Sequence, residues 1–156
     1  MKAIDEIIYE ALKADEQLTT ATDGRVMSTC IEVPPTDADN TPLPYIIVSF
    51  DGLTNDVETK DDPFEGDTDH VSIGIEIAAR TRIELGVLAD RVRKAVHSYC
   101  LQAIENNDTL GEVPEDYTFS AQAVNYDSMK PCYWQILNYQ CDCDNNVIAD
   151  DDDEQE

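Results

Sequence analysis

The stretch "HVSIGIEIAARTRIELGVLADRVRKAV", His70 to Val96, decides the fold, because in it a strand passes directly into a helix. Its first part alternates apolar with small or polar residues, which is the period of a half-buried strand; the apolar positions are Val71, Ile73, Ile75 and Ile77. Its second part has apolar residues at helical spacing, at Leu85, Leu88, Val92, Ala95, Val96 and, just beyond, Tyr99. Thr81 and Glu84 between the two parts fit a capping box. The junction is therefore explained by local structure and requires no active site.

Further elements are predicted on the N-terminal side of this stretch. The first fifteen or so residues have apolar positions at helical spacing and predict an amphipathic helix. "YIIVSF" (Tyr45–Phe50) is apolar and rich in β-branched residues, which favours a central strand buried on both faces. Asp51–Gly52 after it is typical of a tight turn, so "LTNDVET" is expected to pair back as a hairpin.

The C-terminal third predicts a β-hairpin. Tyr117–Val124 and Cys132–Cys141 both alternate, and Met129–Lys130–Pro131 separates them. The fold class expected from all elements is α+β: an antiparallel or mixed β-sheet, with the N-terminal helix and the long central helix packed on one face. Residues 1–141 are expected to form this single domain, and the acidic residues 142–156 a solvated tail.

Composition excludes several classes of function. The 156 residues contain 34 acidic and 10 basic side chains, so the net charge is −24, which argues against binding phosphate backbones through a basic surface. No apolar run approaches the roughly 20 residues that span a bilayer, and the first residues lack a signal-peptide pattern, so we expect a protein that works in the cytoplasm. The five cysteines are expected to be reduced.

The side chains that carry chemistry are few. The segment "DTDH" ending at His70 is a conceivable metal cluster, but a solvated loop end explains it better. The acidic residues from Asp142 to Asp153 fall partly at EF-hand ligand positions, yet Val147 replaces the required glycine. With two histidines and no nucleophile motif, we expect no enzyme, no catalytic residue, no cofactor and no metal.

Charge clusters suggest a candidate subunit interface. Five of the ten basic residues lie on or just before the predicted long helix, at Arg80, Arg82, Arg91, Arg93 and Lys94. An acidic segment surrounds Phe64 and contains Asp61, Asp62, Glu65, Asp67 and Asp69. These clusters have two interpretations: solubility with local pairs, or a head-to-tail contact between copies, which closes into a ring.

The order of these elements resembles the tail-terminator (tail-completion) proteins of long-tailed, lambda-type bacteriophages and prophages. The most specific parts are Pro44–Tyr45–Ile46–Ile47 and the strand that runs through a short polar link into the helix of "LADRVRKAV" type. The resemblance covers about residues 3–140 and rests on order and spacing. The acidity, the long C-terminal hairpin and the acidic tail depart from it.

The resemblance implies a structural role. Copies of such proteins assemble, commonly as a hexameric ring, on the head-proximal end of the tail tube, where they end tube growth and join the tail to the head connector. Its implied partners are copies of itself, the tail tube protein and a head-completion protein, while DNA passes through the lumen without specific binding. The implied location is the host cytoplasm during assembly and then the virion. Another neck component (a head-closure or connector protein) and an acidic DNA mimic remain alternatives.

Overall fold

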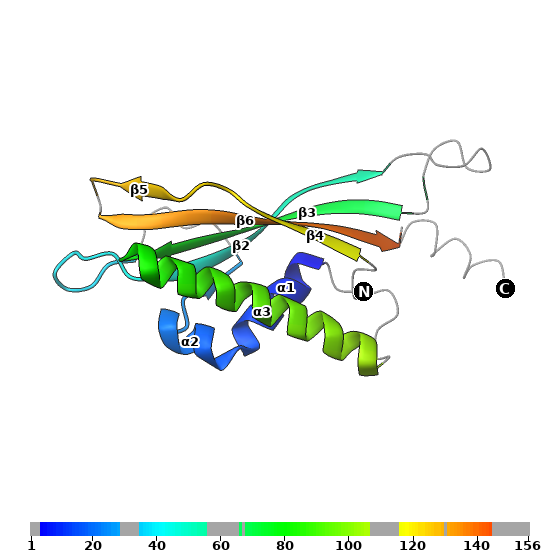
Figure 1. Ribbon diagram of the computed structural model, residues 1–156, viewed down its shortest axis with the longest axis horizontal. Helices are drawn as coiled ribbons and strands as arrows, with labels where there is room; N and C mark the ends of the chain where they lie inside the picture. The colour runs from blue at the N-terminus through cyan, green and yellow to red at the C-terminus, as the bar shows by residue number, and fades with distance from the viewer. Residues whose placement is uncertain are drawn as a thin grey trace.

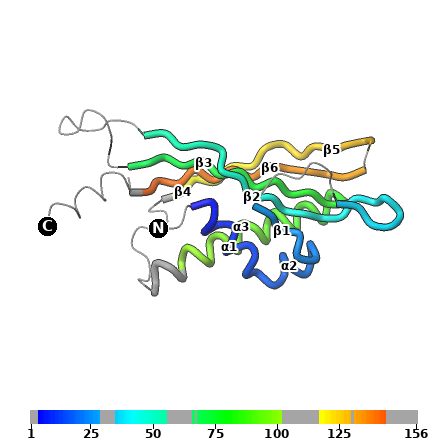
Figure 2. The backbone as a smooth tube through the Cα atoms, turned by 180° about the vertical axis from the view of Figure 1, so that it is seen from behind, coloured from blue at the N-terminus to red at the C-terminus, as the bar shows by residue number. Residues whose placement is uncertain are grey.

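The computed structural model describes residues 4–28, 35–55, 66, 68–106, 116–129 and 131–144. One β-sheet carries the helices on a single face, and the view from behind shows the same arrangement (Figures 1 and 2). The helices are α1 (Ile4–Ala14), α2 (Glu16–Thr22) and α3 (Arg82–Asn106). The predicted α+β class, with both predicted helices on one face of the sheet, is confirmed.

The sheet is mixed, as the fold class allowed. Its strands are β1 (Val26–Met27), β2 (Tyr45–Asn55), β3 (Thr68–Ala79), β4 (Asp116–Ala121), β5 (Asn125–Asp127) and β6 (Cys132–Asp144). Their order is β1-β2-β3-β6-β4, and β5 pairs with β6 next to β4. β1 is parallel to β2, whereas every other pair is antiparallel.

The main core lies between the helices and one face of the sheet, and a second, small cluster of Tyr45, Ile47 and Ala78 is buried on the other face. The alternating isoleucines Ile73, Ile75 and Ile77 of β3 are fully buried in the main core, as predicted. The stripe of α3 from Leu85 to Val96 covers them. The helix begins where the capping residue predicts, since the Glu84 backbone N–H donates to Thr81 Oγ1 at 3.1 Å.

The tight turn predicted at Asp51–Gly52 is wrong. β2 continues through both residues to Asn55, and its register against β3 shifts between Phe50 and Gly52. A one-residue bulge thus takes the place of the turn, and Gly52 accommodates it with a φ of 156° that other residues rarely adopt. Leu53–Asn55 belong to the same strand, and the remainder of the predicted hairpin lies outside the described residues.

The C-terminal hairpin is confirmed with two differences. Its first arm is split into β4 and β5, both paired with β6. β6 continues to Asp144, three residues past the expected domain end at 141, because it pairs with β3 as far as Thr68. Residues 145–156 of the expected tail lie outside the described residues.

Candidate assembly surfaces

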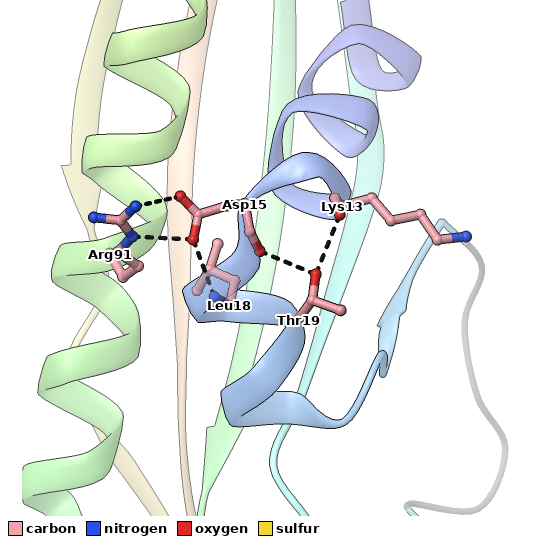
Figure 3. A network of polar contacts seen from close by, with 5 residues as sticks. All are labelled: Lys13, Asp15, Leu18, Thr19 and Arg91. Carbon is pink, nitrogen blue, oxygen red and sulfur yellow. Dashed lines mark hydrogen bonds and ion pairs between the residues drawn. The ribbon is translucent and has the colours of Figure 1, made fainter.

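A polar network ties the N-terminal helices to α3 (Figure 3). Arg91 Nε and Nη2 donate to the Asp15 carboxylate at 3.0 and 2.6 Å. The same carboxylate accepts from the Leu18 backbone N–H at 3.0 Å and so caps α2. Thr19 Oγ1 lies 3.1 Å from the Lys13 carbonyl oxygen and 3.0 Å from that of Asp15. Arg91, one of the candidate interface cations, is therefore engaged within its own subunit.

Two opposing effects act on the pKa of the Asp15 carboxyl group. Burial raises its pKa, but the hydrogen bonds from Arg91 and Leu18 outweigh burial, so the pKa is lowered below 3.8. A carboxyl group with a lowered pKa in the folded state stabilises the fold above its unfolded pKa. This contribution is lost as the pH falls through the folded pKa.

Two substitutions of Asp15 separate the contribution of the helix cap to stability from that of the ion pair with Arg91. Asp15→Ala removes both, and loss of the cap alone costs about 1 kcal/mol. Asp15→Asn keeps a good cap but removes the charge facing Arg91. We expect urea unfolding at pH 7 to rank stability as wild type, then Asn, then Ala. The wild-type advantage over Asn should vanish as the pH falls below the lowered pKa. An advantage that persists undiminished in that acidic range would contradict the ion pair.

The other candidate cations divide into two groups. Arg80 Nε donates to the Pro42 carbonyl oxygen at 2.9 Å and holds the segment 35–44 at the end of the sheet. The Arg93 guanidinium carbon lies 4.1 Å from the centroid of the Phe119 ring. Arg82 and Lys94 are exposed. Local contacts therefore account for Arg80, Arg91 and Arg93, although the Arg93 side chain remains exposed.

The acidic segment around Phe64, which was predicted to contact the basic residues, lies only partly within the described residues. Asp61, Asp62, Phe64, Glu65 and Asp67 lie outside the described residues. Asp69 lies in β3, where its Oδ1 accepts from Asn55 Nδ2 at 2.8 Å. The predicted contact between the two clusters thus stays a prediction.

A groove of about 450 Å³ runs between α3 and β4. It is lined by Asp90, Arg93, Lys94, His97, Tyr117, Phe119 and Tyr139. The rings of Tyr117 and Phe119 lie 5.6 and 5.2 Å from the ring of Tyr139, centroid to centroid. His97 Nδ1 lies 3.0 Å from the Tyr117 hydroxyl. The groove therefore combines an aromatic floor with a cationic rim, which sequence spacing did not reveal.

The second face of the sheet, here called the open face, is not covered by any helix of the described chain (Figure 1). A hollow of about 290 Å³ on it is lined by Ile47, Ser49, Asp51, Gly74, Glu76, Gln122, Ile136 and Asn138. Asp51 extends over Gly74, where a Cβ atom would lie only 2.5 Å from its Oδ2. The strands β1–β6 contain no Lys or Arg, so the permanent charges that the strands place on this face are all negative.

Glu76 occupies the centre of the open face between β2 and β6, opposite Ile47 and Ile136. Burial raises its pKa, and a hydrogen bond from the Tyr45 hydroxyl offsets part of that rise. Burial and the Glu76 charge raise the pKa of Tyr45 to about 12. Tyr45 is therefore a neutral donor throughout the physiological pH range.

Glu76→Gln is expected to stabilise the subunit at neutral pH. A raised pKa means that ionised Glu76 destabilises the fold, and this penalty develops as the pH rises above the unfolded pKa of 4.5. Gln keeps an acceptor for Tyr45 and carries no charge. Urea unfolding should show a gain for Gln at pH 7.5 that shrinks at pH 4. A loss at pH 7.5 would mean that the ionised carboxylate is stabilised in the folded state.

His70 differs from its expected place. It is the third residue of β3 rather than a solvated loop end, because β3 begins at Thr68. Its Nδ1 lies 2.6 Å from Asp142 Oδ1 across the ladder to β6. Among the described residues, no group of three or more His, Cys, Asp or Glu side chains has the arrangement to hold a metal ion.

Both edges of the sheet carry strands without an outer partner in the described chain. Within the described residues, β1 pairs only with Ile46 and Ile47 of β2, and no described strand pairs with the outer edge of β2 from Ser49 to Asn55. Two large apolar side chains, Phe50 and Leu53, are exposed on this part at 51% and 49%. At the other edge lie β4 and β5. Such edges are sites where another strand can add.

Comparisons with known proteins relate the chain to others through its fold. No family model matches the sequence, and no curated protein matches it. Among solved structures, a chain of the virion of a native gene transfer agent (GTA) particle has the same fold, with a TM-score of 0.55. The match covers 92% of this chain and 96% of that chain at 18% identity, so it establishes a common fold. None of the described helices is sufficiently long and apolar to cross a membrane.

Proposed function

We propose that the chain is a structural component of a phage-like virion, a tail terminator that forms a ring on the head-proximal end of the tail tube. The observation that carries the proposal is the fold shared along nearly its whole length with a chain of the GTA virion. The order of motifs that resembles tail terminators is independent support. This role requires surfaces for assembly and no catalysis.

The sheet provides a way to close such a ring. From β2 to β4, four antiparallel strands follow one another in the order β2-β3-β6-β4, so the two outer strands run in opposite directions. When copies are related by rotation about an axis along the strands, the β2 edge of one copy meets the β4 edge of the next in antiparallel orientation. This contact is heterologous and repeats until the ring closes.

The same contact buries the exposed apolar side chains of β2. Phe50 pairs with Ile73, Ile73 with Tyr139, and Tyr139 with Phe119, so these four residues lie at one level of the sheet. Joining the edges at equal register places Phe50 beside Phe119 of the next copy. Leu53 then lies beside Tyr117 of that copy. Cross-strand aromatic pairs of this kind stabilise sheets.

The position of the helices favours one face of the sheet as the lining of the proposed channel. The helices occupy the other face, and a ring has room for them on its outside, so in this proposal the open face lines the lumen. In a hexamer, four strands per copy at ~4.8 Å spacing give a circumference of roughly 115 Å and a diameter of roughly 37 Å before strand tilt. This wall would carry Asp51, Glu76 and Asp142 but no Lys or Arg. Phosphates would be repelled, which suits DNA that passes without binding.

The proposal is tested by measuring assembly. Mass photometry of the purified full chain should give one closed oligomer, and electron microscopy with the tail tube protein should show it at one end of each tube. Binding to a head connector without binding to tubes would instead indicate another neck component. A monomer that does not bind to tubes but binds a DNA-processing enzyme would indicate a DNA mimic and refute the proposal.

A further inference from the structure

We infer that the groove between α3 and β4 receives residues 61–67 of a neighbouring copy, with Phe64 on its aromatic floor and the flanking acids at its cationic rim. This inference rests on the ring proposed above and adds a second contact to it. The occupant is a segment of this same chain.

The chemistry of the groove fits an acidic segment that contains an aromatic residue. Arg93 and Lys94 are exposed at its rim, against the single carboxylate of Asp90. Tyr117, Phe119 and Tyr139 form its floor, and burial keeps both tyrosine hydroxyls neutral by raising their pKa values. A volume of about 450 Å³ lies within the usual range of binding pockets.

The sequence offers one segment with that combination. "KDDPFEGD", Lys60 to Asp67, holds four acids around Phe64. Of the three phenylalanines, Phe50 and Phe119 lie in strands. The acidic residues 150–156 contain no aromatic side chain. Acidic charge and an aromatic residue therefore occur together in the segment around Phe64, and both complement the groove.

The strand order places this segment beside the groove of the next copy. The chain leaves β2 at Asn55 and returns at Thr68, at the end of the sheet where β4 begins. Within one subunit, β3 and β6 separate β2 from β4. In the proposed ring, β2 of the neighbour lies directly against β4, with its Leu53 at the level of Tyr117. In the sequence, the segment 61–67 begins eight residues after Leu53.

A photo-cross-linker tests the occupant. p-Benzoylphenylalanine in place of Phe64 should cross-link two full-length chains upon irradiation, and peptide mapping should place the link within residues 90–97 or 117–119. A link to these residues within a single chain would overturn the assignment to a second copy. A link elsewhere, or none in intact rings, would overturn the groove as the docking site.

Charge reversal tests the rim independently. Arg93→Glu with Lys94→Glu should increase the dissociation of rings on dilution by roughly tenfold or more. Adding Asp61→Lys and Asp62→Lys should restore at least part of that loss, whereas a structural defect in α3 would not be rescued. Arg82→Glu, on the same helix outside the groove, is the matched control and should leave dissociation unchanged. If none of the charge reversals changes the dissociation of the rings, this inference is refuted and the proposed function is not. If the wild-type chain forms no rings, the proposed function is refuted.

Discussion

Replacing Phe50 and Leu53 together by lysine is expected to give a folded protein that no longer assembles. Both side chains are about half exposed on the part of β2 that has no outer partner among the described strands, so the monomer loses little when they become polar. In the proposed ring they face Phe119 and Tyr117 of the next copy. Buried lysines there would lose their hydration without a partner, so the contact should weaken at least 100-fold. Mass photometry should detect monomers, and circular dichroism should match the wild type.

The matched control replaces two apolar residues that are equally exposed elsewhere. Ile83 and Val87 are 82% and 63% exposed and belong to α3, not to either edge strand. Ile83→Lys with Val87→Lys adds the same charge, yet the ring should persist. If the control dissociates and the β2 variant assembles, the subunits meet through α3, and the edge-to-edge geometry is wrong.

The elements that the sequence predicted correctly are those specified by local spacing. The strand and helix of residues 70–96 follow from alternation, helical spacing and one capping threonine, all within the segment itself. The turn at Asp51–Gly52 failed because the ladder to β3 continues on both sides of it. Ladder pairing of ten residues outweighs a two-residue turn preference, so the dipeptide was accommodated as a bulge.

Helix α2 was not predicted, although its signals are present. Asp15 is a good capping residue, and Asp23 with Gly24 ends the helix in the left-handed conformation. Seven residues are too few to show a clear apolar period, and the predicted N-terminal helix covered only about the first fifteen residues, before α2 begins.

The candidate surfaces depend on contacts between distant residues. Asp15 and Arg91 are 76 positions apart, and only the fold reveals that this cation is neutralised. The sequence could group basic residues on one helix, but it could not divide them into engaged and exposed ones. The groove required Phe119 and Tyr117 from β4 beside Arg93 of α3. The edge of β2 that lacks an outer partner among the described strands emerged only from the strand order of the sheet.

Ile75→Ala is expected to be among the most destabilising single changes in the chain. Ile75 is fully buried at the centre of β3, between Val48 of β2 and Leu137 of β6. Truncation there removes apolar contacts and leaves a cavity that the flanking strands cannot close, which costs about 3–4 kcal/mol. For a domain of this size the melting temperature should fall by about 10 °C. The measurement belongs in the Phe50→Lys, Leu53→Lys background, where assembly does not add to stability.

Ile136→Ala on the open face is the informative comparison. Ile136 is only partly buried and lies beside Glu76 rather than under a helix. Its truncation should therefore cost less than half as much as that of Ile75 in the monomer, since surrounding water can occupy the space. Equal losses at both positions would mean that the open face is covered as deeply as the helical face within one subunit. A face covered in that way has no lumen to line, and the proposed orientation of the ring would fail with it.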